Sequence, residues 1–149
     1  MSLTQTEADR LIDVEKRFLI ERPVVLPAPG KWWYGDLISV DRREEFRLGI
    51  FRGHLGHARY TAILMSHSQS NAVLVRLDVG VLGVHPNPDG TRVAGSHLHL
   101  YREGYDDKFA YPIVGYPFSD PDDIVKGIAD FFLFCKVVAP PPIWPRLIP

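Results

Sequence analysis

The feature that most constrains this fold is a run of alternating, β-rich segments that follow one another with only short turns between them. They read "WWYGDLISV" at about 32–40, then "EFRLGIFRG", "ARYTAILMSHSQ" and "NAVLVRLDVG". In the second segment Phe46, Leu48 and Ile50 alternate with more polar or smaller residues, which predicts a strand with one packed face. Consecutive strands joined by short turns pair as antiparallel neighbours, so this stretch predicts an antiparallel sheet.

Helical patterns stand at both ends of that run. "TQTEADRLIDVEKRFLIER" begins with a capping box, Thr4 and Glu7, and its apolar residues recur at helical spacing, which predicts a helix over about 5–21. In "FSDPDDIVKGIADFFLFCKVV" we expect Asp120 to cap a second helix whose apolar face includes Ile128 and Phe131. "SHLHLYRE" predicts a fifth strand, and "GYDDKFAYP" a turn that leads to a sixth, short strand.

This order predicts an α+β fold: an N-terminal helix, an antiparallel sheet of about five strands, and a C-terminal helix packed on one face of the sheet. Residues 1–139 are expected to form a single domain, and the proline-rich segment 140–149 a tail.

The composition excludes several classes of protein. The formal net charge is −1, which removes the simplest argument for a nucleic-acid-binding domain, namely a strongly basic one. Cys135 is the single cysteine, so disulfides within the chain and zinc sites with two or more cysteines are excluded. Neither a signal peptide nor an apolar membrane span is recognisable, and we therefore expect a cytoplasmic protein with no membrane partner.

Polar residues gather on the fourth and fifth expected strands. Because side chains alternate, His97, His99 and Tyr101 should share one face of their strand, opposite Leu98 and Leu100. On the preceding strand Leu74, Arg76 and Asp78 should share the face opposite the valines. If the two strands pair, these polar groups occupy one face of the sheet, less buried than the other, and His85 in the connecting loop could join them.

Three interpretations fit this face. It could be an ordinary solvated surface, because exposed sheet faces need polar residues. It could be a metal site, in which the His-x-His spacing supplies two ligands and Asp78 or His85 a third. It could be an active site without metal, in which a histidine transfers protons, an arginine holds a phosphate and a tyrosine orients it.

The segment that follows the polar strand adds candidate substrate contacts. "YREGYDDKF" interleaves basic and aromatic residues, a combination that can contact phosphates and stack on bases, although a charged turn has the same composition. From this segment we expect substrate contacts from Arg102, Glu103, Tyr105 and Phe109, together with His85, and a catalytic role for Lys108.

The motifs "LVRLDVG", "HPNPDGTRV", "SHLHLYREGYDDKFAYP" and "DPDDIVKGIADFFLF" together resemble a family of small, uncharacterised bacterial proteins often found near mobile elements. The chain matches the family pattern over nearly its whole length, with Phe109 where the pattern has tryptophan. The resemblance implies no established activity. It implies only that the motif of the polar strand recurs in that family.

From these features we expect a toxin-like or defence-related protein that acts on RNA, specifically an endoribonuclease that uses neither a metal nor a cofactor. His97 and His99 would act as base and acid, with Tyr101, Arg76, Asp78 and Lys108 completing the catalytic group. The alternative is a partner-binding protein without activity, an inhibitor or accessory factor of a mobile element, whose exposed aromatic residues contact another protein.

Overall fold

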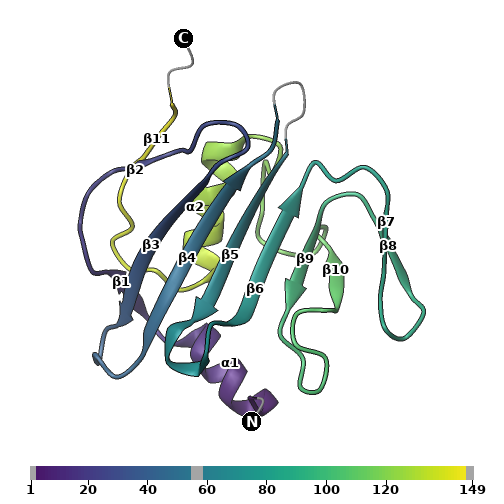
Figure 1. Cartoon of the computed structure of the whole chain (residues 1–149), viewed down its shortest axis with the longest axis horizontal. Helices are drawn as coiled ribbons and strands as arrows, with labels where there is room; N and C mark the ends of the chain where they lie inside the picture. Colours follow the sequence, from purple (N-terminus) through teal and green to yellow (C-terminus); the bar gives the residue numbers. More distant parts are fainter. Residues whose placement is uncertain (1–2, 55–58, 147–149) are drawn as a thin grey trace.

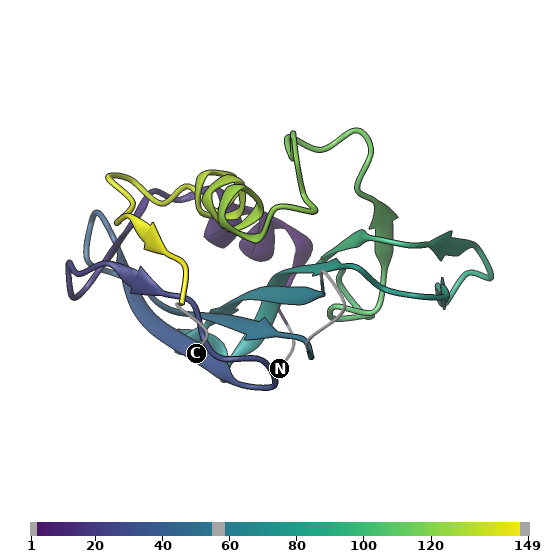
Figure 2. The same ribbon diagram turned by 90° about the horizontal axis from the view of Figure 1, so that it is seen from above.

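The computed structural model describes residues 3–54 and 59–146, and these form an α+β fold around one large antiparallel sheet. Two helices, α1 (Gln5–Asp13) and α2 (Ile124–Phe134), cover the same face of the sheet and leave the other face free of helices (Figures 1 and 2). The predicted fold class is therefore confirmed.

The sheet is larger than expected, with seven strands where we predicted about five. Its spatial order is β1-β3-β4-β5-β6-β9-β10, and every neighbouring pair is antiparallel. The two strands beyond those five are short ones at the edges: β10 is the sixth, short strand expected after the turn in "GYDDKFAYP", and β1 was not predicted. The bounds are β1 Lys16–Phe18, β3 Trp32–Ser39, β4 Glu45–Arg52, β5 Tyr60–Ser66, β6 Ala72–Val79, β9 His97–Leu100 and β10 Ala110–Pro112.

Three smaller elements lie outside the main sheet. β7 (Val84–Pro86) and β8 (Arg92–Ala94) form a hairpin, and His67–Gln69 form a single 3₁₀ turn, η1. β2 (Val24–Val25) pairs in parallel with β11 (Ile143–Trp144), so the proline-rich segment contacts the domain through this ladder. The last part of the expected tail, 147–149, lies outside the described residues.

The first helix ends at Asp13, so the predicted helix over about 5–21 was wrong in its second half. The chain becomes extended at Val14, and Lys16 then pairs with Ser39 of β3 as the start of β1. The Lys16 ammonium also donates to the carbonyls of Ile12 and Val14, which satisfies acceptors at the end of the helix. The apolar residues whose spacing predicted one long helix therefore lie partly in α1 and partly in the edge strand β1.

The second helix is capped by Asp123 and not by Asp120 as predicted. The Asp123 carboxylate accepts a hydrogen bond from the backbone N–H of Lys126 at 3.1 Å, because Pro121 and Asp122 lie in a turn ahead of the helix. Within the helix, Gly127 provides the space into which the ring of Tyr60 from β5 fits. Close packing between α2 and the sheet depends on this glycine.

A β-bulge in β6 changes which side chains face the core. Leu64 pairs with Val75 and Met65 with Val73, so Leu74 is an extra residue without a partner on β5. Leu74 and Val75 are both fully buried in the core. The prediction that Leu74 shares a face with Arg76 and Asp78 was therefore wrong.

Candidate functional site

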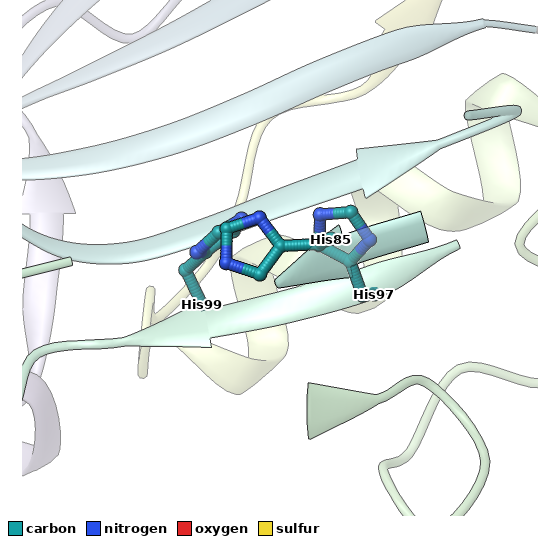
Figure 3. A group of neighbouring side chains, drawn as sticks. All are labelled: His85, His97 and His99. Atoms are coloured by element: carbon teal, nitrogen blue, oxygen red, sulfur yellow. The ribbon is translucent and has the colours of Figure 1, made fainter. Parts of the chain in front are cut away.

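The site is built on β6 and β9, which are hydrogen-bonded neighbours. Arg76 lies opposite His99 and Asp78 opposite His97. The condition on which the predicted cluster depended, the pairing of these two strands, is therefore met. The β7–β8 hairpin then places His85 against the other two histidines (Figure 3), with ring centroids 4.8–5.5 Å apart.

His97 and His99 are buried and His85 is half-buried, which corrects the expectation of a less buried sheet face. The relative solvent exposure is 3% for His97 and 2% for His99, because the hairpin and the loop 101–109 cover this end of the sheet. Asn87 fixes the hairpin in place: its amide donates to the carbonyl of Ala110 in β10 and accepts from the N–H of the same residue. Simple solvation of a polar strand does not account for imidazoles held in this way.

Each imidazole donates one ring N–H to a backbone carbonyl. Nδ1 of His97 lies 2.8 Å from the Gly95 oxygen, and Nδ1 of His99 lies 2.7 Å from the Asp107 oxygen. Nε2 of His85 lies 2.9 Å from the Lys108 oxygen. A carbonyl only accepts, so the proton of each neutral ring is on the anchored nitrogen and the other nitrogen carries a lone pair.

Asp78 is the central acceptor of the cluster. Its Oδ2 atom lies 3.5 Å from Nε2 of His97 and 3.3 Å from Nε2 of His99, and its Oδ1 accepts from the Thr61 hydroxyl at 2.7 Å. Burial raises the pKa of Asp78, but its contacts with the two histidines, its hydrogen bond from Thr61 and the charge of Arg76 hold that pKa well below its usual range. The same carboxylate raises the pKa of His97.

Arg76 connects the buried cluster to the surface. It donates through Nε to Asp78 at 2.9 Å and through Nη1 to Asp107 at 3.3 Å, and its Nη2 lies 3.4 Å from Nε2 of His99. Its side chain is 35% exposed, in contrast to the histidines. The guanidinium is therefore held in a fixed orientation and still meets solvent.

Two open clefts reach the cluster, and His85 lines both of them. The first, of about 320 Å³, is lined by Arg76, His85, His99 and Lys108 among others. The second, of about 270 Å³, is lined by Arg59, Arg76, Asp78 and His97 among others. Two acidic residues line the clefts, Asp78 and Asp107, and both form ion pairs with Arg76. Arg59 and Lys108 add further positive charge to the lining of the clefts.

The structure brings together Arg76, Asp78, His85, His97, His99 and Lys108 of the predicted site residues, and places the others elsewhere. Tyr101 points into the core below the sheet, where its hydroxyl donates to the Leu3 carbonyl, because the strand ends at Leu100 and the alternation stops there. Glu103 accepts from the N–H of Gln5 at the start of α1.

The remaining predicted substrate contacts form a small stack of their own. The Arg102 guanidinium lies over the ring of Phe109, 4.2 Å from its centroid, and Tyr105 meets Phe109 edge to face. Phe109 is buried, so its ring is not available to stack on a base. Tyr105 is exposed.

Sequence reasoning missed several members of the site. Thr61 and Asp107 hold Asp78 and Arg76, Arg59 lines a cleft, and three backbone carbonyls orient the histidines. Only Asp107 left a signal, since it lies within the motif around the polar strand. The carbonyls could not be found from residue types at all.

An aromatic patch shares the helix-free face with the cluster. Trp32 and Tyr34 of β3 are 44% and 47% exposed, and their rings stack 5.4 Å apart with an interplanar angle of 7°. Phe51 of β4 adjoins Trp32. Two rows of directly paired residues run across the strands from this patch to the cluster. They are Trp32–Phe51–Thr61–Asp78–His97 and Tyr34–Gly49–Ile63–Arg76–His99.

Comparison with known proteins gives one family. Residues 3–137 match the model of a family described as a family of unknown function (DUF6978). No curated protein and no solved structure matches the chain. Neither helix within 3–54 and 59–146 has the length and apolar character needed to cross a membrane.

Proposed function

The chain belongs to this family of unknown function, DUF6978, so its activity has to be inferred from the site, and we propose that it cleaves phosphodiester bonds in single-stranded RNA. The observation that carries the proposal is the shared pair of cross-strand rows, which connects an exposed aromatic patch to a cluster of histidines, an arginine and a carboxylate. Aromatic side chains on an open sheet face are a common platform for unstacked RNA bases.

The spacing suits one strand of nucleic acid that contacts both parts. Trp32 on β3 and Asp78 on β6 are separated by three strand-to-strand steps, roughly 14 Å at about 4.8 Å per step. Bases stacked on Trp32 and Tyr34 would leave the backbone to continue across β4 and β5 toward Arg76. Double-stranded RNA would hide its base faces, and therefore a single strand is the substrate we propose.

Arg76 is the group we assign to the phosphate. It lines both clefts and is held by Asp78 and Asp107, and an arginine fixed in this way binds a phosphate with little loss of side-chain freedom. Lys108 and Arg59, one in each cleft, add charge for the neighbouring phosphates. This local concentration of cations offsets the slightly negative net charge of the whole chain.

In the proposed reaction the 2′-hydroxyl loses a proton and attacks phosphorus, the bond to the 5′ oxygen breaks, and that oxygen takes up a proton. We had divided base and acid between His97 and His99. Both of their Nε2 atoms face the same Asp78 oxygen, so they act on one side of a substrate and not across it. The proposal therefore assigns proton transfer to the cluster as a unit, including His85.

The proposal keeps three wider expectations. A bacterial protein encoded near mobile elements rests on the resemblance of motifs, a toxin-like or defence-related type on that resemblance and the polar residues, and a cytoplasmic location on the sequence features described above. An inhibitor or accessory factor without activity would use the same aromatic patch to bind a protein, and the experiment below separates the two.

The test uses purified chain and a fluorescently labelled single-stranded RNA, with single-stranded DNA of the same sequence beside it. We expect cleavage of the RNA only, and a loss of about 100-fold or more in rate for Arg76→Met, the usual cost of one charge-stabilising donor. Trp32→Ala should weaken RNA binding, whereas Trp144→Ala, an equally exposed tryptophan on β11, should not. Intact RNA with the wild-type chain would overturn the proposal in favour of the partner-binding protein.

A further inference from the structure

We propose that His85, His97 and His99 together bind one divalent transition-metal ion of the zinc class. Within the described residues, these three offer ligand atoms that all lie within 4.8 Å of one another. The inference concerns the same site as the proposed function, but the binding of the ion does not depend on RNA being the substrate. It replaces our expectation of a centre without metal, and with the ion bound the proton transfer assigned above to the imidazoles would fall to water at the ion.

The first argument is the anchoring of all three rings. Histidines that bind metals almost always donate the other ring N–H to a carbonyl or carboxylate, which fixes the tautomer and the direction of the ligating lone pair. Here three carbonyls, from Gly95, Asp107 and Lys108, receive those protons at 2.7–2.9 Å. The three anchored rings come from two elements and lie close together (Figure 3), each with a ligand atom within 4.8 Å of the others.

The second argument is the position of Asp78. Nε2 of His97 and Nε2 of His99 face the same Asp78 oxygen, at 3.5 and 3.3 Å. With Nδ1 of each ring anchored on a carbonyl, an ion bound by the two Nε2 atoms would lie beside a carboxylate that offsets part of its charge.

The donor set indicates the class of ion. Three imidazoles suit zinc, iron, copper or nickel, whereas magnesium and calcium prefer oxygen ligands. Three histidines also leave a tetrahedral ion one open position, the arrangement of catalytic zinc sites, where the pKa of a bound water falls to about 7. The two clefts that His85 lines would provide access to that position.

Arg76 is the cation in contact with a proposed ligand, and its charge opposes the ion. Its Nη2 lies 3.4 Å from Nε2 of His99, a long contact between a donor and a ligating atom. Its charge is shared by Asp78 and Asp107, which contact it at 2.9 and 3.3 Å. Because the side chain is partly exposed, a small movement toward solvent frees the lone pair of His99 and leaves the guanidinium beside the ion, where it can contact a phosphate.

The test measures ion binding directly. The purified chain is stripped with a chelator, dialysed, and titrated with Zn²⁺ by calorimetry and with Co²⁺ by visible absorption, and bound metal is counted by mass spectrometry. We expect one ion per chain and a Co²⁺ spectrum typical of tetrahedral coordination. His85→Ala, on the hairpin, should weaken binding by more than about 100-fold, beyond the cost of losing a mere supporting hydrogen bond.

The control is His67→Ala, which removes an exposed histidine on η1 and should bind Zn²⁺ as the wild type does. His97→Ala removes a buried side chain, so its Zn²⁺ affinity is compared only if its circular dichroism spectrum matches that of the wild type. Less than about 0.2 ion per chain, or equal affinity in wild type and His85→Ala, would overturn the inference. Ion binding without RNA cleavage would refute the proposed function alone, and RNA cleavage by a chain that binds no ion in the titrations would refute the metal site alone.

Discussion

The ammonium group of Lys16 donates a 2.9 Å hydrogen bond to the carbonyl oxygen of Cys135, although 119 residues separate the two. The same group donates to Ile12 and Val14, so one buried cation closes the last turn of α1 and the end of α2 together. It also lies over the ring of Phe46, 4.8 Å from the centroid. Both helices are thereby fixed to the first strand of the sheet.

Replacing this lysine should be costly. Lys16→Met keeps most of the side-chain volume but leaves three carbonyls without their donor, and we expect a loss of about 2–4 kcal/mol in the free energy of unfolding, measured by urea denaturation. Lys136→Met is the matched control, because Lys136 is half exposed and only 3.8 Å from Asp13 in a surface ion pair. It should change stability by less than about 0.5 kcal/mol. Equal effects of the two substitutions would contradict this role for Lys16.

Stability should also depend on pH in the alkaline range. Burial lowers the pKa of Lys16 from 10.5 to about 8, so between these values the unfolded chain binds more protons and stability rises with pH. Burial raises the pKa of the Cys135 thiol from 9.0 to about 12, so above pH 9 this group acts in the opposite sense.

The two effects predict a rise of about 1 kcal/mol between pH 8 and 9, followed by a plateau and then a loss of stability above pH 10.5. Urea midpoints measured from pH 7.5 to 11 test the curve. Lys16→Met should remove the rise, and Cys135→Ala should extend it beyond pH 9. A stability that falls steadily from pH 8 in the wild type would refute the assignment to Lys16.

The contact between Gly127 and Tyr60 gives a prediction about packing. A Cβ at residue 127 would overlap the Tyr60 hydroxyl, which donates to the Pro121 carbonyl at 2.6 Å. Gly127→Ala should therefore destabilise the chain by about 1–2 kcal/mol, although alanine favours helix by about 1 kcal/mol. In a Tyr60→Phe background the same substitution should cost at least about 1 kcal/mol less, because the overlapping oxygen is gone. Additive effects in this double-mutant cycle would show that the two residues do not interact.

The hairpin that carries His85 depends on Asn87. Asn87→Asp keeps the shape of the side chain but can no longer donate to the Ala110 carbonyl, and the hairpin should lose its fixed position over β9. We expect Zn²⁺ affinity to fall by about 10–100-fold, the usual cost of losing support for a metal ligand. Asp89→Ala, at the exposed turn of the same hairpin, should stay within about twofold by calorimetry. Unchanged affinity in Asn87→Asp would mean that another contact holds the hairpin.

The periodicity of the sequence predicted the α+β class and the face of β4 that packs in the core, because both depend on neighbours in the chain. It placed helical structure beyond Asp13 because Phe18 and Leu19 continue a helical spacing, whereas pairing with β3 decides their conformation. Leu74 was assigned to the wrong face because a bulge depends on how two strands align, which a single strand does not reveal.

The candidate site was predictable where it follows strand alternation and was not where it depends on loops. Arg76, Asp78, His97 and His99 come together as their alternation and the pairing of β6 with β9 require. The burial of the histidines results from a hairpin held by contacts between residues 23 positions apart, Asn87 and Ala110. Tyr101 left the site because the strand ends after Leu100 and its side chain enters the core, and Phe109 left it because its ring is buried against Arg102 and Tyr105.

The bulge at Leu74 also sets where this chain can change its length during evolution. Removing one residue between Val75 and Val79 would turn part of the strand over and bring apolar side chains to the face where Arg76 and Asp78 meet the histidines. Removing Leu74 itself would leave Val73 and Val75 opposite Met65 and Leu64 in regular pairing, at the cost of one core side chain. Relatives with a shorter version of this strand should therefore lack this residue and retain the order of polar groups that follows it.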